Sequence, residues 1–330
     1  QLRAALLHQD WINVLQQLKK WPQKEQASER WQYWYARALM RNGQQNKAQT
    51  AFQRLAQQRS YYGFLAADQI NSAYHLKHAP TPITQAQLGE VKGMPGIQRA
   101  IELHALKRDT QARREWIYTT KKFNREQLYA ASVIAEEIDW HDQAIFTIAK
   151  TGYWDDLELR FPLRHHEWVA QQANQYRLDS AWMFAVIRQE SAFMRDARSH
   201  AGAIGLMQLM PATARHVARD YLKRSAPRKQ ALFKAETNIE LGSAYLRQLM
   251  DRFDNNPVLV TAAYNAGPHR VNSWLPEKSV PADIWVEMVP FKETSTYLRR
   301  VLSYTVIYDK RLGRIPKRLA QRMRQITTAH

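Results

Sequence analysis

The 330-residue sequence contains no cysteine, which excludes a disulfide framework and any thiolate metal site. No stretch approaches the roughly 20 consecutive apolar residues that a membrane-spanning helix requires. Acidic side chains are scarce, with 30 Asp and Glu against 48 Lys and Arg, so the formal net charge is +18. This imbalance favours an anionic partner, which leaves nucleic acid, an acidic membrane surface or a polymer that bears carboxylates.

Patterns typical of metal binding are also missing. His165 and His166 are adjacent, but they have no spaced companion and no nearby acidic cluster, so a zinc site is not predicted. No Asp-rich loop has the spacing of a calcium site. We therefore expect neither a metal nor any other cofactor.

The first half of the chain predicts paired helices. Residues 31–42 and 45–57 flank Gly43 as a helix–turn–helix of the tetratricopeptide kind, and a second pair is predicted at 127–137 and 141–151. Prolines at positions 80, 82 and 95 interrupt the pattern between the two pairs. We therefore expect an α-superhelix fragment at 1–76, a linker at 77–92, a small helical linker domain at 93–158 and a further domain at 159–330.

Stacked repeats need neighbours to bury a continuous core. Because the chain begins at Gln1, without a methionine or a signal peptide, we expect a processed or truncated product with further repeats upstream.

An aromatic cluster and a basic tail each allow two interpretations. Trp31, Tyr33, Trp34 and Tyr35 could stack on sugars or bases, but most of them are expected to pack in the core between helices. The basic tail at 310–324 is expected to be a solvated helix face, with contact to an anionic glycan or membrane as the alternative.

A single glutamate, Glu190, lies on the apolar stripe of a predicted helix. The helix begins at Asp179, a favoured N-cap, and Met183, Val186 and Ile187 share the face of Glu190. Partial desolvation there raises the pKa of a carboxyl group, as a general acid for glycosidic-bond cleavage requires. The alternative is that Glu190 ends the helix and turns into water.

Two later segments carry polar groups in unusual settings. Between Ser199 and Pro211, glycines predict a compact loop or hairpin, in which Gln208 offers an amide suited to sugar hydroxyls and Met207 is a candidate for core packing. A helix without charge over 258–266 places Tyr264 and Asn265 in its last turn. Buried polar groups need partners, which would be a substrate, the acid or the backbone of a neighbouring loop.

Together these segments resemble the soluble lytic murein transglycosylases, which share the goose-type lysozyme fold. The resemblance rests on Arg188-Gln189-Glu190-Ser191-Ala192-Phe193, the segment Ser199 to Pro211, Asn238-Ile239-Glu240-Leu241-Gly242 before Tyr245-Leu246, Ala263-Tyr264-Asn265-Ala266-Gly267-Pro268, and Val286 to Thr294 with Tyr297. It is strong over 161–312 and weaker before, where Tyr61 to Ala67 is similar to the end of the family's superhelix. The fold implied is mainly α, with a superhelical fragment and a helical linker domain before a mostly helical lysozyme-like catalytic domain.

Two positions depart from the family pattern. Met194-Arg195 stands where members commonly have Asn-Pro, a change expected to alter only the turn that leaves the catalytic helix. Ser295 stands where an arginine is common, which removes a cation beside the groove and puts the role of that position in doubt.

The resemblance implies a periplasmic enzyme that cleaves the MurNAc–GlcNAc bond of peptidoglycan and forms 1,6-anhydro products. Its partners would be glycan strands with their stem peptides and proteins of cell-wall synthesis or remodelling, not nucleic acid. The site residues implied are Glu190 as the acid, Tyr264 and Tyr297 flanking it, Ser199, Met207, Gln208 and Asn265 in the glycan subsites, and Glu287 at the groove edge near the stem peptide.

Two other functions stay open from the residues. A hydrolase on the same fold would use the same acid, with water replacing the sugar's own hydroxyl. A basic helical-repeat protein could instead bind nucleic acid or scaffold the cell wall, with an inactive catalytic domain, although an intact Glu190 argues against that version.

Overall fold

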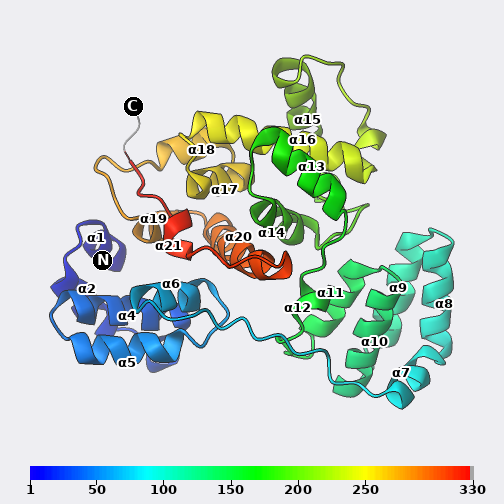
Figure 1. Cartoon of the computed structure of the whole chain (residues 1–330), viewed down its shortest axis with the longest axis horizontal. Coiled ribbons are helices and arrows are strands. Elements are labelled where there is room, and N and C mark those ends of the chain that lie inside the picture. The colour runs from blue at the N-terminus through cyan, green and yellow to red at the C-terminus, as the bar shows by residue number, and fades with distance from the viewer. Residues whose placement is uncertain (328–330) are drawn as a thin grey trace.

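The computed structural model describes residues 1–327 and forms three helical lobes (Figure 1). This mainly helical architecture confirms the predicted fold class. Strand pairing within 1–327 is confined to isolated antiparallel bridges, Arg198–Ile204, Ile204–Leu209 and Val280–Ile326. None of the helices described is both long and apolar enough to cross a bilayer.

The N-terminal lobe (residues 1–69) consists of stacked antiparallel helices. They are α1 (Leu2–Leu7), α2 (Trp11–Lys19), α3 (Gln23–Gln26), α4 (Glu29–Arg41), α5 (Gln45–Leu55) and α6 (Tyr61–Gln69). Ser28 caps α4 by accepting a hydrogen bond from the backbone N–H of Trp31. Gly43 adopts a φ of 77°, which allows the tight turn between α4 and α5.

The middle lobe (residues 85–149) follows a long extended connection. Its helices are α7 (Gln85–Lys92), α8 (Pro95–Ala105), α9 (Asp109–Thr120), α10 (Arg125–Glu137) and α11 (His141–Ala149). They enclose a separate core around Trp116, Ile134 and Trp140.

The linker predicted at 77–92 differs from the structure in its second half, where α7 forms. Thr84 and Gln87 make a reciprocal capping box at its start, and Leu88 and Val91 are buried in the core of the middle lobe. Because the segment is short and lacks a sustained period, the prolines around it obscured this helix in the sequence.

The C-terminal lobe (residues 157–326) holds the remaining helices. They are α12 (Leu157–Arg160), α13 (His166–Tyr176), α14 (Ser180–Ser191), α15 (Pro211–His216), α16 (Ala235–Arg252), α17 (Pro257–Ala266), α18 (Pro268–Ser273), α19 (Ala282–Met288), α20 (Lys292–Arg311) and α21 (Leu319–Arg322), with a π-helical turn at Val217–Tyr221 and a 3-10 turn at Lys229–Phe233. The long helix α20 packs along α14 and α17 and so forms the centre of the lobe.

The N-terminal and C-terminal lobes share one continuous apolar core, in which α6 packs against α20 and α21. Polar contacts reinforce this junction: Arg37 pairs with Asp283, and the Tyr33 hydroxyl donates to Asp283 at 2.7 Å. The basic tail is not the solvated helix face that its charge pattern predicted. Arg318 instead reaches Asp68 of the N-terminal lobe, and the Arg322 side chain is mostly buried between Asp179 and Asp309 of its own lobe.

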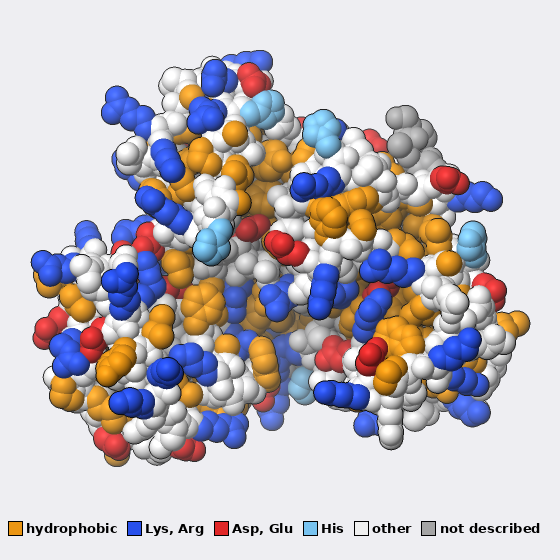
Figure 2. Space-filling model, turned by 180° about the vertical axis from the view of Figure 1, so that it is seen from behind, with side chains coloured by type: hydrophobic (Ala, Val, Ile, Leu, Met, Phe, Trp, Pro, Cys, Tyr) orange, Lys and Arg blue, Asp and Glu red, His pale blue; other side chains and the backbone are white. Residues whose placement is uncertain are grey.

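On the face that Figure 2 shows, basic side chains are spread broadly instead of gathering in one patch. Figure 2 shows them scattered over the whole rear face, with a hollow between the lobes that has apolar walls and acidic groups at its floor.

Candidate active site

Helix α14 is buried along nearly its whole length, from Ser180 to Arg188. Asp179 caps its start by accepting a hydrogen bond from the Ala181 N–H, as the sequence predicted. The helix ends where Ala192 and Phe193 adopt left-handed conformations, with φ of 50° and 66°. The last turn therefore carries Glu190 out of the fully buried part of the helix, to a position where it is partly exposed.

The carboxyl group of Glu190 is largely desolvated and has one hydrogen-bond donor, the Tyr297 hydroxyl, at 2.7 Å. Burial raises the pKa of Glu190 to about 7, the Tyr297 hydrogen bond opposes that rise, and the nearby charge of Glu293 adds to it. The side chain does not turn into water. Its surroundings keep a large fraction protonated near neutral pH.

Two tyrosines lie close to this carboxyl group. Burial and the negative charge of Glu190 hold the pKa of both Tyr264 and Tyr297 well above the usual range. Both hydroxyls therefore remain protonated donors. Tyr297 donates to Glu190, whereas Tyr264 donates to the carbonyl oxygen of Met207 at 2.7 Å and so fixes the loop that faces the acid.

The loop between α14 and α15 is held by a buried asparagine, Asn238 of α16. Its side chain accepts from the Met207 N–H at 2.7 Å and donates to the carbonyls of Ile204 and Leu232 at 2.9 and 2.8 Å. Gly205 has a φ of 78°, and a Cβ there would lie 2.4 Å from both the Asn238 amide nitrogen and the Leu232 carbonyl oxygen. The close approach of loop and helix thus requires glycine.

The predicted subsite residues on this loop differ in their exposure. Met207 is completely buried against Gly242, so its side chain fits the interpretation of core packing instead of a ligand contact. Gln208 donates its amide to the carbonyls of Gly205 and Ala197, at 2.8 and 3.2 Å. Ser199 is exposed, and its hydroxyl accepts from the Ala203 N–H at 3.0 Å.

Asn265 lies at the end of α17, beside the start of α20. Asn256 caps that helix, Pro257 begins it and Ala266 ends it, close to the range 258–266 that the sequence predicts. The side-chain oxygen of Asn265 accepts from the Thr294 hydroxyl at 2.7 Å, which leaves the amide N–H groups directed away from that bond.

Glu287 is not at an open groove edge. It is 2% exposed, accepts from Arg30 Nε at 2.7 Å and from the Tyr62 hydroxyl, and so lies in the junction with the N-terminal lobe. The sequence could not show this because α19 is covered by α4 and α6, which lie far away in the chain. Both carboxylate oxygens are occupied by these structural partners.

At both positions that depart from the family pattern, the side chain contacts a charged residue. Ser295 is buried and accepts from Arg299, one turn further along α20, at 2.7 Å, so a guanidinium still lies beside this position. Arg195 does more than alter a turn, since it comes within 3.8 Å of Asp109 in the middle lobe.

Sequence reasoning missed Glu293 and Asn238 as parts of the site. Glu293 precedes Tyr297 by four residues, the spacing that places two side chains on one helix face. This spacing could have predicted that Glu293 lies near the acid. Asn238 gave no such signal, because its partners lie in a loop some 30 residues earlier.

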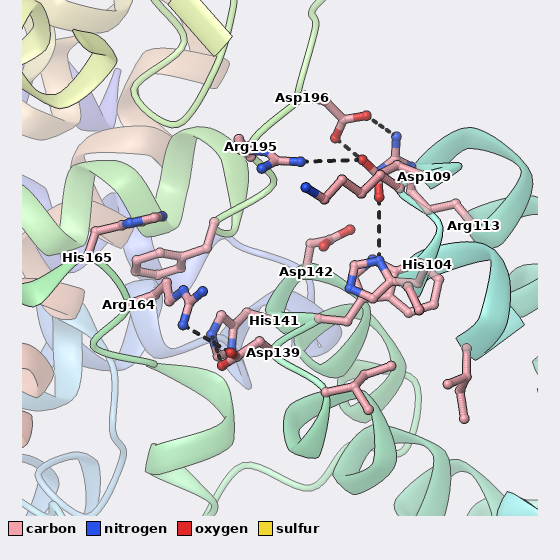
Figure 3. Close-up of a pocket in the computed structure, with 16 residues that line it drawn as sticks. His104, Asp109, Arg113, Asp139, His141, Asp142, Arg164, His165, Arg195 and Asp196 are labelled. Carbon is pink, nitrogen blue, oxygen red and sulfur yellow. Dashed lines mark hydrogen bonds and ion pairs between the residues drawn. The ribbon is translucent and has the colours of Figure 1, made fainter. Parts of the chain in front are cut away.

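A second cleft, of about 420 Å³, separates the middle lobe from the turn after α14. Figure 3 shows that acidic and basic side chains from the two sides point toward one another across it. The pairs are Arg113 with Asp196, Arg195 with Asp109, and Arg164 with Asp139. These charges compensate each other and join the lobes. No group of three or more His, Asp or Glu side chains in 1–327 has a geometry suited to a metal ion.

Two family models match the chain over the lobes just described. The Transglycosylase SLT domain matches residues 167–284, which include Glu190, the Asn238-anchored loop and Tyr264. The soluble lytic murein transglycosylase L domain matches residues 90–157, most of the middle lobe. The chain belongs to the soluble lytic murein transglycosylase family.

Relatives within this family extend the match to the N-terminal lobe. The soluble lytic murein transglycosylase of Escherichia coli K12 is 32% identical over 319 residues, which cover 96% of this chain and 49% of the relative. The chain therefore spans about half the length of the curated relatives it matches.

Solved structures of the family agree in their arrangement of lobes. An inactive mutant of lytic transglycosylase Slt from Pseudomonas aeruginosa matches with a TM-score of 0.92 at 39% identity, over 96% of this chain and 52% of that one. The 70 kDa soluble lytic transglycosylase from Escherichia coli matches with a TM-score of 0.88 at 30% identity, over 98% and 52%.

Proposed function

We propose that this chain is a lytic transglycosylase that cleaves the MurNAc–GlcNAc β-1,4 bond of peptidoglycan and releases 1,6-anhydro products. The observation that carries this proposal is Glu190, whose carboxyl group lies in the last turn of α14, accepts a hydrogen bond from Tyr297 at 2.7 Å and has its pKa raised by burial to about 7. The net charge of +18 suits a polymer whose stem peptides carry carboxylates. A location in the periplasm of a Gram-negative bacterium fits this substrate and the resemblance to the relatives.

The reaction needs one carboxyl group that acts twice. Protonated Glu190 gives its proton to the glycosidic oxygen as the bond from that oxygen to C1 of N-acetylmuramic acid breaks. The carboxylate then removes the proton from the C6 hydroxyl of the same sugar, and O6 bonds to C1 without water. The acetamido group of the sugar stabilises the positive charge at C1 in place of a second carboxylate.

The neighbouring residues support each stage of this cycle. Tyr297 keeps the carboxyl group oriented and stabilises its ionised form after the first transfer. Tyr264, by anchoring the Met207 backbone, holds the loop that carries Ser199 and Gln208 against the glycan. The amide of Asn265 is available to a sugar hydroxyl or acetamido group.

A hydrolase on the same fold is the second candidate, and Glu293 is the observation that favours it. This carboxylate is exposed and close enough to raise the pKa of Glu190. Two carboxyl groups about a bond are the usual arrangement in glycosidases, with one of them activating water.

Mass spectrometry of the soluble products from murein sacculi separates these functions. We expect products one water lighter than reducing-end muropeptides from the intact chain and from Glu293→Gln, and none from Glu190→Gln. Hydrated products that disappear with Glu293→Gln would establish the hydrolase. A lack of products from a folded chain that still binds sacculi would favour a binding protein.

A further inference from the structure

A groove of about 700 Å³ runs along the N-terminal lobe, and its lining includes none of the residues around Glu190. It lies between the end of α3 and the helices α4 and α5, and the side chains used below are Trp31, Gln32, Tyr35, Asn46, Lys47 and Arg54. Its wall on α5 runs from position 46 to 54, about 12 Å at the helical rise of 1.5 Å per residue. This length accommodates at least two linked sugar rings.

Two of the four clustered aromatic residues form a platform in this groove. Tyr33 and Trp34 are buried, as predicted for core packing. Trp31 and Tyr35 are only partly buried and stack on each other, with ring centroids 4.4 Å apart and planes 13° apart. Trp31 Nε1 donates to the Leu18 carbonyl at 2.8 Å, which fixes the orientation of the platform. Fixed aromatic faces suit the apolar C–H face of a pyranose ring.

The polar lining of the groove matches an anionic sugar. Amide groups of Gln32 and Asn46 can both donate and accept hydrogen bonds, as sugar hydroxyl and acetamido groups require. Lys47 and Arg54 supply positive charge, and no Asp or Glu lines the groove. Arg54 makes no ion pair with any residue in 1–327, so its planar donors are available to a carboxylate.

The groove faces away from the catalytic lobe. Arg30, Tyr33 and Arg37 of α4 contact Glu287 and Asp283, and the helical period places Trp31 and Tyr35 on the other side of the same helix. In Figure 1, α5 likewise lies on the side of α4 remote from α19 and α20. A ligand in the groove therefore leaves the contacts of Glu190 unchanged.

We propose that this groove is a second binding site for a carboxylate-bearing, N-acetylated glycan, which holds a strand apart from the site of cleavage. The chemistry of the groove carries the proposal, whereas the identification of the glycan as murein rests on the proposed function. The lactyl carboxylates, which are free on peptide-free strands, pair with Arg54 and Lys47, and one sugar ring stacks on the platform of Trp31 and Tyr35.

Hydrogen exchange of the full chain carrying Glu190→Gln tests the proposal with a peptide-free murein tetrasaccharide. We expect protection of residues 29–55 that is separate from protection of residues 180–210. Tyr35→Ala should shift the tetrasaccharide concentration at half-protection of 29–55 about tenfold upward, and Arg54→Gln about threefold, while protection of 180–210 persists. Tyr118→Ala, which removes an exposed ring on α9, is the matched control and should change neither.

The retained protection at 180–210 shows that the C-terminal lobe of each variant is folded, and Arg54 is an exposed residue. The proposal would be overturned if the tetrasaccharide failed to protect α4 and α5, or if Tyr35→Ala left that protection unchanged. Stronger protection by oligothymidine would replace the glycan with a single-stranded nucleic acid. Equal half-protection by neutral chitotetraose would refute the role of the carboxylates. Protection at 29–55 alone would refute the proposed function and leave the groove standing.

Discussion

Glu190 and Glu287 are both glutamates of the C-terminal lobe, the first partly buried and the second fully buried, and their partners differ. Glu190 has only a tyrosine hydroxyl at 2.7 Å, whereas Glu287 has the guanidinium of Arg30 together with the Tyr62 hydroxyl. Without a cation, burial disfavours the charge of Glu190 and raises its pKa to about 7. A buried carboxylate with a guanidinium joins two lobes, whereas one without a guanidinium is available for proton transfer.

The largest effect is expected from Glu190→Gln, which removes the transferable proton and keeps the size of the side chain. Turnover of sacculi should fall about 10²- to 10⁴-fold, the usual contribution of general acid–base catalysis. Glu287→Gln, measured at a temperature where it is folded, should lose far less activity. Comparable losses in both variants would contradict the division of roles between the two glutamates.

The same substitution at Glu190 should stabilise the protein at alkaline pH. The folded-state pKa lies above the ordinary 4.5, so the favourable contribution of the protonated acid is present below about pH 4.5 and is lost as the pH rises through 7. Above pH 7 the ionised carboxylate costs about 3 kcal/mol, at about 1.4 kcal/mol per pKa unit. Thermal melting at pH 8 should show a higher Tm for Glu190→Gln, with little difference at pH 5.

Removing Glu287 should destabilise the protein, in contrast to the substitution at Glu190. Glu287→Ala leaves Arg30 and Tyr62 without their partner and should cost about 2 kcal/mol, because Arg30 is partly exposed and can recover water. Urea denaturation of this variant measures the loss. Glu158→Ala, which removes an exposed carboxylate paired with Arg311, is the control and should be nearly neutral.

The smallest effect is a shift of the pH profile by Tyr297→Phe. The Tyr297 hydroxyl lowers the pKa of Glu190, so its removal should raise that pKa further, by an amount smaller than the effect of burial. In the wild type, kcat/KM should fall as the pH rises through about 7, because the acid must be protonated. The midpoint of this fall should lie at higher pH in Tyr297→Phe. A midpoint that moves downward would mean that Tyr297 acts chiefly by positioning.

Local signals in the sequence predicted much of this architecture. Asp179 and Asn256 begin their helices as N-caps, and Glu190 stands out because a charge interrupts an apolar stripe. Pro211 stands at the first position of α15, where its missing N–H costs nothing. Such features depend on residues within a few positions of one another, so short-range patterns are sufficient to find them.

Contacts between distant segments were not predictable in the same way. The partners of Glu287 lie in α4 and α6, and no spacing rule connects them to α19. The sequence identified Met207 as a candidate for core packing, but no spacing rule indicated that it would pack closely against Gly242. The pKa of Glu190 could be predicted in direction only, since its value depends on how completely α20 covers the end of α14.

The shared core of the N-terminal and C-terminal lobes imposes an order on synthesis. Helix α6 can pack on α4 and α5 as soon as it is made, but its face toward α20 and α21 needs later cover, and Glu287, the partner of Tyr62, follows 225 residues later. At about 5–20 residues per second, this delay lasts about 10–45 s. During that interval the middle lobe can close on its own core, while the nascent N-terminal helices remain an open, aggregation-prone surface until α20 and α21 arrive.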